Sequence, residues 1–304
     1  MSRVAGVELE LAPLELLPLA VPALMYAVRA RRLARRGRSV PAWRQACFFC
    51  GLVLVAATLA TLAPPSDELL YVHMIEHLLI GDVAAILLVL GLTGPLLQPI
   101  LTVKPLDKLR ILAHPAVALP LWAIDLYLWH LPVVYQETLR SDPLHALEHM
   151  MFIFFGCLMW MPILGPLPKP AWFGTGWKVI YVVLVRFIPA VLANVLLWSG
   201  TVLYPIYEAG ERAHGLSPLA DQGVAGAIMM GEGMLVTLIV LAWALLRWAA
   251  ESTERQRLLD LAEGRGVELS PARAARAVEA GRAAELEERI RAGTVPPGTT
   301  RSAE

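Results

Sequence analysis

Long apolar stretches recur along this chain, and each is long enough for a helix to cross a membrane. Such a helix needs about 20 mostly apolar residues, and hydrophobic residues make up 57% of the chain against 17% charged ones. Lipid offers the backbone no hydrogen-bond partners, so only helices and closed barrels span it. Continuous apolar runs lack the alternation of barrel strands. We therefore predict an all-α, polytopic membrane helical bundle with seven transmembrane helices, at residues 11–28, 45–63, 70–97, 113–134, 144–164, 178–203 and 219–248.

The loops between these spans alternate between basic and nearly neutral, which predicts the orientation. Lys and Arg concentrate in cytoplasmic loops. The first, third and fifth loops carry Arg29, Arg31, Arg32, Arg35, Arg36, Arg38, Arg44, Lys104, Lys108, Arg110, Lys169 and Lys178. The second loop has no basic residue, and the fourth and sixth have only Arg140 and Arg212. We expect the N-terminus outside, the C-terminus in the cytoplasm, and a first span that is retained, because the N-terminal segment lacks the features of a signal peptide.

The pattern His-x-x-Glu-His occurs twice within the apolar sequence. Its copies are residues 73–77 and 145–149, and positions i, i+3 and i+4 share one face of a helix. Each copy therefore presents two imidazoles and a carboxylate in one direction. Polar clusters inside membrane segments are costly and usually functional, so identical spacing in two copies favours a metal site. A set of interfacial histidines with satisfied hydrogen bonds is the structural alternative.

The predicted topology places five of the seven histidines at one depth near the outer surface. The third and fifth spans both run inward and open with a copy of the motif, whereas the fourth runs outward and ends at Trp129-His130. Asp142-Pro143 is a suitable N-cap and first turn for the fifth helix. We expect His114 to be structural and His214 to be solvated. The predicted metal ligands are His73, His77, His130, His145, His149, Glu76, Glu148, Asp221 and Met229.

The donor types favour copper as the metal. Imidazole suits zinc, copper, iron and nickel, while thioether sulfur favours Cu(I). Eight of the ten methionines lie on the third, fifth and seventh spans, and Met74 and Met150 directly adjoin histidines. A single methionine is an ordinary filler of apolar gaps, but this group beside the outer histidines favours copper, Cu(I) or Cu(II), with zinc as the alternative. Glu76 and Glu148 would be ligands or acceptors that orient the imidazoles.

Enzymatic readings of the same motif remain as alternatives. His-x-x-Glu-His is also the inverted zinc-peptidase signature, in which Glu is the general base beside two His ligands. A membrane zinc hydrolase is therefore one alternative, and a histidine-rich di-iron enzyme is another. One copy would suffice for the hydrolase, and duplicate copies on two helices fit a shared binding site better. The number and outer position of the histidines weigh against the di-iron enzyme.

Four charged residues near mid-membrane suggest a third class of function, a metal or proton permease. They are Asp82, Asp125, Arg186 and Glu232. Such residues usually face the interior of a bundle and pair with one another. The structural interpretation is that Glu232 or Asp125 neutralises Arg186, and the functional one is a polar path for ions. Asp82 lies five residues after His77, about 140° around an α-helix, which predicts that it is not on the ligand face.

The residues after the last span differ in character. We divide the chain into a transmembrane domain, 1–250, and a cytoplasmic helical tail, 251–304. Ser270-Pro271 is a good start for a helix over 271–291, and the end beyond 295 is predicted to be disordered. Cys47 and Cys50 have the spacing of a redox or metal motif, but they lie at the predicted cytoplasmic end of the second span, where a structural disulfide is not expected.

Four separated motifs resemble the CtaG-type family of cytochrome c oxidase assembly proteins, in the order of that family. The stretch 71–79, Tyr-Val-His-Met-Ile-Glu-His-Leu-Leu, resembles the opening of its transmembrane core. Residues 129–135 resemble the next block, and 145–160, with both motif histidines, the third. The fourth is 217–226, which contains Asp-Gln-x-x-Gly. The resemblance covers about 11–250, and the tail lies outside it.

The resemblance implies an assembly factor for haem–copper oxidases that handles copper, and not an enzyme. It implies a multi-pass protein of a bacterial inner membrane whose partners are haem–copper oxidase subunits and other copper chaperones, besides membrane lipid. The chain has a formal net charge of zero, so we expect no nucleic-acid partner. From the residues and the resemblance together, we expect an outward-facing copper site made by the predicted ligands.

Overall fold

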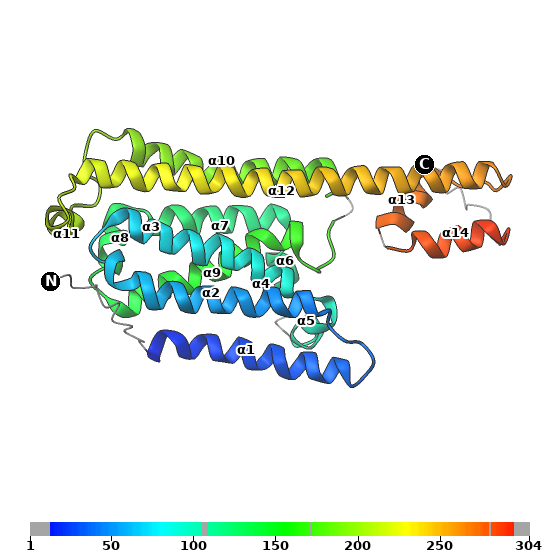
Figure 1. Ribbon diagram of the computed structural model, residues 1–304, viewed down its shortest axis with the longest axis horizontal. Helices are drawn as coiled ribbons and strands as arrows, with labels where there is room; N and C mark the ends of the chain where they lie inside the picture. Colours follow the sequence, from blue (N-terminus) through cyan, green and yellow to red (C-terminus); the bar gives the residue numbers. More distant parts are fainter. Residues whose placement is uncertain (1–12, 105–108, 171, 280, 295–304) are drawn as a thin grey trace, which may run out of the picture. The chain divides into compact units, whose positions relative to one another are not determined.

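The computed structural model of the protein consists of helices joined by turns and short loops (Figure 1). It describes residues 13–104, 109–170, 172–279 and 281–294, and none of these residues forms a β-strand. The all-helical fold is therefore as predicted. The chain divides at Thr237 into two compact units, and helix α12 (Pro218–Glu263) continues through this boundary. The division predicted at residue 250 stays a prediction.

Five of the described helical segments are long and apolar enough to cross a membrane, and a bent pair of helices is a sixth candidate. The bent pair is α7 (Pro115–Trp129) and α8 (Pro132–Thr138), which meet at an angle of 75°. The first predicted span overlaps α1 (Pro13–Ala34), which is not among these candidates, so the count of seven stays a prediction. The five segments are α2 (Ala42–Ser66), the continuous run Leu70–Gly91, α9 (Asp142–Leu164), α10 (Thr175–Trp198) and α12.

The third predicted span, 70–97, ends earlier in the structure. Its elements are α3 (Leu70–Leu78), the π-helix η1 (Leu79–Ala84) and α4 (Ala85–Gly91), and α5 (Gly94–Leu101) follows separately. Leu92 and Thr93 between them are extended. Arg44 of α2 donates to the carbonyls of Leu90 and Leu92 at 2.9 and 2.8 Å, which satisfies acceptors at the end of α4. Gly94 and Pro95 mark this break in the sequence, but the apolar residues on both sides of it led the prediction to extend the span to 97.

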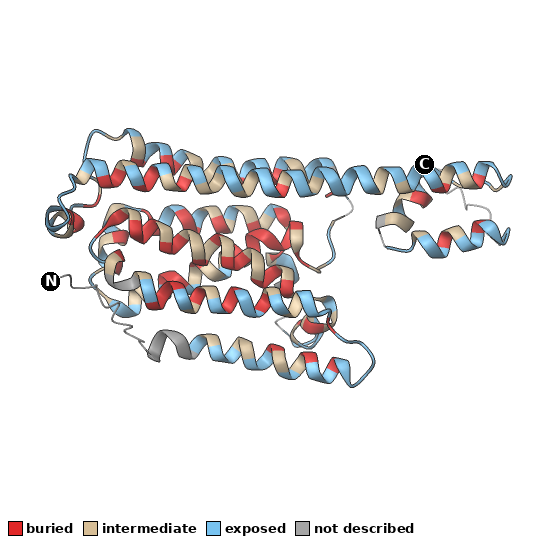
Figure 2. Ribbon diagram, in the orientation of Figure 1, coloured by how far each residue is buried: buried red, intermediate tan, exposed pale blue. Residues whose placement is uncertain are grey.

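The two helices that carry the His-x-x-Glu-His motifs lie at the centre of the first unit. In the most apolar windows of Leu70–Gly91 and of α9, 56% of the residues are buried, compared with 28–39% in the other three segments. Helix α9 packs against α7, α4 and η1, and α2 packs along α3, η1 and α4. Figure 2 shows the resulting concentration of buried residues on these inner helices. The motifs are therefore in the best-packed part of the fold.

Two glycines allow these inner helices to approach closely. A Cβ atom at Gly156 of α9 would clash with the backbone carbonyl of Gly81 in η1. A Cβ at Gly81 would in turn touch Phe152, one turn before Gly156, at 3.4 Å. Small residues let the backbones of transmembrane helices meet directly. This contact sets the distance between α9 and η1, and thus between the two helices that carry the motifs.

Short helices complete the first unit. The N-cap of α9 is Ser141, and Asp142 and Pro143 are its first two residues. The cap therefore lies one residue before the predicted Asp142. Gly210 lies in the short helix α11. It lets this helix approach Glu68, because a Cβ at Gly210 would clash with the Glu68 carbonyl. The short elements are α6 (Leu109–Leu112), η3 (Pro205–Tyr207) and α11 (Glu208–Ala213).

The second unit contains the end of α12 and two short helices. The tail helix predicted over 271–291 is divided into α13 (Pro271–Glu279) and α14 (Ala283–Arg291). Gly281, between them, has a φ of 67°, which glycine adopts without strain. The apolar core of this unit comprises Leu258, Ala262, Leu286 and Ile290. The predicted disorder beyond 295 lies outside the described residues.

Candidate metal centre

Three helices bring the five predicted histidines together. His73 and His77 lie on α3, His145 and His149 on α9, and His130 is the C-cap of α7. The N-terminal ends of α3 and α9 lie at the end of the bundle opposite to the arginine-rich loop between α1 and α2 (Figure 1). The histidines therefore gather at the end that the charge pattern assigns to the outside.

The imidazoles of the two motifs pack against one another. The ring centroids of His73 and His77 are 4.2 Å apart, and those of His145 and His149 are 4.3 Å apart. Across the two helices, His73 stacks on His145 at 5.2 Å with 19° between the ring planes. His77 lies 5.4 Å from His149, edge to face. These four rings form one compact cluster, which we call the four-histidine cluster.

Both motif glutamates also face this cluster. Glu76 and Glu148 are fully buried, and Glu76 Oε1 lies 4.0 Å from His149 Nε2. Two sets of donor atoms, each within 4.8 Å of one another, can be drawn from the described residues: His73, His77, His145 and Glu148, and Glu76, His145 and His149. His145 belongs to both sets, so the two potential ion positions are neighbours.

Several ring nitrogens in this region are buried without a hydrogen-bond partner. They are both nitrogens of His77 and the Nε2 atoms of His130, His145 and His149. Such atoms are rare in proteins, and each costs about 1–3 kcal/mol. Neutral imidazole nitrogen is also the commonest metal ligand. The donor set therefore fits a metal ion, which would supply the missing partners, whereas satisfied structural histidines would require hydrogen bonds that these residues do not make.

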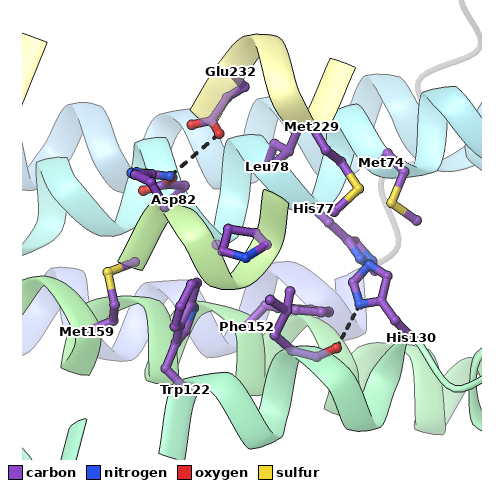
Figure 3. Close-up of a pocket in the computed structure, with 14 residues that line it drawn as sticks. Met74, His77, Leu78, Asp82, Trp122, His130, Phe152, Met159, Met229 and Glu232 are labelled. Atoms are coloured by element: carbon purple, nitrogen blue, oxygen red, sulfur yellow. Dashed lines mark hydrogen bonds and ion pairs between the residues drawn. The ribbon is translucent and has the colours of Figure 1, made fainter. Parts of the chain in front are cut away.

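His130 lies beside the four-histidine cluster. Its Nδ1 is 2.7 Å from the carbonyl oxygen of Leu126, which makes this nitrogen the N–H donor and leaves Nε2 as an acceptor. His130 belongs to neither set of donor atoms. Instead it lines a small cavity together with His77 (Figure 3). The five predicted histidines thus divide into a group of four and a separate one.

Three tyrosines surround the cluster, and sequence reasoning assigned them no role. Tyr135, fully buried, has its ring centroid 5.1 Å from that of His73 and shares a 2.9 Å hydrogen bond with the Tyr207 hydroxyl. Tyr204 donates to the backbone carbonyl of His130 at 2.8 Å. Burial raises the pKa of Tyr204 and of Tyr207, so both stay neutral. In the sequence, the position of Tyr204 and Tyr207 directly after an apolar span could have indicated a polar contact with the cluster.

The two remaining histidines lie outside the cluster, as expected. His114 is the N-cap of α7, and its Nδ1 accepts a hydrogen bond from the backbone N–H of Ala116 at 3.2 Å. His214 is exposed, and its Nε2 lies 3.6 Å from Glu68. Both are therefore suitable controls for substitutions in the cluster.

Residues 24–251 match the family described as cytochrome c oxidase caa3 assembly factor. The chain belongs to this family. The match covers most of the chain and includes all nine predicted site residues, and it ends close to the predicted start of the tail at 251. No curated protein and no solved structure matches the chain.

Within the region that the family shares, Asp221 has a definite structural role. Its two carboxylate oxygens accept hydrogen bonds from the backbone N–H groups of Leu70 and Tyr71, at 2.8 and 3.0 Å. These are the first residues of α3, whose N-terminal N–H groups need partners outside the helix. Asp221 of α12 therefore caps the helix that carries His73 and His77, and it belongs to neither set of donor atoms.

The neighbouring Gln222 and Gly226 also hold α12 in place. Gln222 accepts from the N–H of Leu203 at 2.8 Å and donates to the carbonyl of Thr201 at 3.2 Å. A Cβ at Gly226 would lie 2.6 Å from the Ala193 carbonyl. The Asp-Gln-x-x-Gly block thus packs α12 against neighbouring parts of the bundle. Met229, one turn after Gly226, instead lines the cavity beside His77 and His130.

Three of the four charged residues predicted to lie near mid-membrane pair with one another. Arg186 binds Asp82 directly and lies 3.7 Å from Glu232, and the indole N–H of Trp160 donates to the other oxygen of Asp82 at 2.6 Å. Glu232 is thus a partner of Arg186, as proposed, but Asp82 was missed. Of the two partners suggested for Arg186, the structure has Glu232, whereas the Asp125 carboxylate accepts from Trp129 at 2.8 Å.

The π-helix η1 affects where the side chain of Asp82 lies. Asp82 lies within η1, and its side chain lines the same cavity as His77. The i→i+5 hydrogen bonds of a π-helix make each turn wider, so residues five apart lie closer to one face than in an α-helix. The prediction that Asp82 is not on the ligand face agrees with the two sets of donor atoms, neither of which includes it.

Proposed function

We propose that this protein binds copper at the four-histidine cluster and passes it to a haem–copper oxidase during assembly. The observation that carries the proposal is the group of buried imidazole nitrogens without hydrogen-bond partners, inside a member of an oxidase assembly family. Copper is the metal of the client enzyme, and here it is cargo. The proposed setting is a bacterial inner membrane, with oxidase subunits and copper chaperones as partners.

Within the cluster, we assign the metal to the side chains that make up the two sets of donor atoms. His145 is common to both sets, and His73, His77 and His149 complete them with Glu76 and Glu148. The carboxylates would act as further ligands or as acceptors for imidazole N–H groups, as is usual around metal-bound histidine. Asp221 is engaged by backbone amides of α3, so we assign it to positioning and no longer to ligation.

Copper is favoured over zinc by affinity and by the surroundings. Sites of nitrogen and oxygen donors bind Cu²⁺ more tightly than other divalent first-row metals, and thioethers suit Cu(I). Two buried methionines, Met74 and Met229, line the cavity next to His77. Met150, in contrast, is 49% exposed, so adjacency in sequence to His149 does not bring it to the cluster.

Metal analysis of the purified protein tests the metal itself. We expect copper in the wild type and at least a tenfold loss of affinity in His145→Ala, because even residues that only support metal ligands are worth 10–100-fold. His214→Ala, a substitution of an exposed histidine, should keep the copper. Zinc together with peptidase activity would favour the hydrolase, and metal uptake into vesicles the permease.

Oxidase activity in cells tests the role in assembly. Deleting the gene should lower the activity and copper content of a haem–copper oxidase while its transcript stays constant. Wild type and His214→Ala should restore activity, and His145→Ala should not, although it reaches the membrane in equal amount. Normal oxidase activity and copper content in the deletion strain would contradict the proposal.

A further inference from the structure

A cavity of about 60 Å³ lies deeper in the bundle than the four-histidine cluster. One end is formed by His77, His130, Met74 and Met229, and the other by the ion pair of Arg186 with Asp82 and Glu232 (Figure 3). The rest of its wall is largely apolar. The cavity therefore has two chemically different ends, and only one of them offers neutral ligands for a metal.

The first end presents soft donors. Met74 is 1% and Met229 6% exposed, and Figure 3 shows both side chains directed toward the imidazoles of His77 and His130. The Nε2 atom of His130 is an acceptor without a partner, in a ring held by the Leu126 carbonyl. Two thioethers and imidazole nitrogen form a donor set that selects Cu(I) over harder cations.

The space left open argues against simple gap filling by these methionines. Methionine usually occupies irregular gaps in a core, which removes the cavity. Here the methionines border a space of about 60 Å³, and a cavity of about 10–15 Å³ is enough to hold one water molecule. The space next to His130 therefore has room for a bound ion. At the opposite end the carboxylates of Asp82 and Glu232 are already paired with Arg186, so the ligands open to an ion are those at the histidine end.

We propose that His130, Met74 and Met229 form a second, Cu(I)-selective site in this cavity, with His77 between it and the four-histidine cluster. The inference rests on the proposed copper function and assigns a separate role to His130. Both ring nitrogens of His77 are without partners, so this residue can serve either site. Copper would pass between the two sites as Cu(I), by exchange of ligands at His77, so its oxidation state stays the same.

X-ray absorption of the full-length protein loaded with Cu(I) tests the second site. The wild type should show sulfur as well as nitrogen around copper. Met74→Leu and Met229→Leu should lose the sulfur signal and about one copper per chain, and the swap conserves volume well enough for folding. The matched controls Met150→Leu and Met234→Leu change methionines that are 49% and 64% exposed, and they should match the wild type.

A variant of the other site separates this inference from the proposed function. His145→Ala should lose copper bound by nitrogen and oxygen but keep the copper bound by sulfur. Copper surrounded by nitrogen and oxygen alone in the wild type, or a sulfur signal that survives both Met74→Leu and Met229→Leu, would refute the second site and leave the copper function standing. A wild type that binds no copper at all would refute both.

Discussion

At the scale of single residues, one buried carboxylate lies between the loop that joins α10 to α12 and the helix that carries the first motif. Glu211 is 2% exposed, and its Oε2 has no hydrogen-bond partner. Burial, and then the neighbouring Asp221, raise the pKa of Glu211 to about 7. Asp221 itself caps α3. The charge on Glu211 therefore acts directly on the residue that holds the first motif helix.

The pKa of Glu211 predicts a pH dependence of stability. The folded state holds its proton up to about pH 7, against 4.5 for the ordinary carboxyl. Below pH 4.5 both states are protonated, so no penalty arises. As the pH rises from 4.5 to 7 the unfolded state loses this proton first, and stability falls. Glu211→Gln should remove this part of the slope, as thermal melting in detergent at several pH values would reveal. Parallel pH profiles for the variant and the wild type would contradict this assignment.

The sequence predicted which residues form the cluster better than it predicted the contacts between separate helices. The repeated spacing of His73 to His77 and His145 to His149 identified the side chains that meet, because helix periodicity is local. Partners on separate helices, such as Asp82 with Arg186 or Asp221 with α3, depend on tertiary packing. Nor does periodicity reveal a π-helix like η1.

At the scale of elements, the contact between Gly156 and Gly81 holds the motif helices at a fixed distance. No ligand takes part in it, and Gly81 lies four residues after His77 on the same run of helices. Gly156 can approach only because it lacks a Cβ. The spacing of the histidines thus depends on a contact outside the cluster.

Gly156→Ala should therefore disturb metal binding without altering a ligand. Overpacking a tight contact costs about 1–3 kcal/mol, and we expect a lower melting temperature together with weaker copper binding. Gly231→Ala is the matched control, because a Cβ there meets nothing within 4 Å. In a helix interior that change should stabilise by about 0.5–1 kcal/mol. Wild-type copper affinity in Gly156→Ala would show that the contact does not set the cluster's geometry.

Most elements were predictable because apolar runs mark helices that lie in lipid. The breaks within them were not, for distinct physical reasons. The end of α4 depends on Arg44 from another helix, and the division of the tail depends on the positive φ of Gly281. The 75° bend between α7 and α8 lies at His130 and Leu131, directly before Pro132.

At the scale of the whole molecule, the predicted outward position of the histidines depends on the orientation of the bundle. A reporter that works only in the cytoplasm should be active when fused after Arg36, Lys104 or Lys169, and inactive after Asp67 or Arg140. The reason is the excess of Lys and Arg in the first set of loops. The opposite pattern would place the histidines on the cytoplasmic side and exclude an outer copper site.

The cap from Asp221 to α3 joins residues 150 and 151 positions apart, which has a consequence for the order of synthesis. Helix α3 leaves the ribosome long before α12, because the chain is made from its N-terminus. Until α12 inserts, the N–H groups of Leu70 and Tyr71 lack this carboxylate. The histidine cluster thus reaches its final geometry only when the last span is in the membrane. A nascent chain cannot present the finished cluster, so the proposed metal capture requires the completed protein.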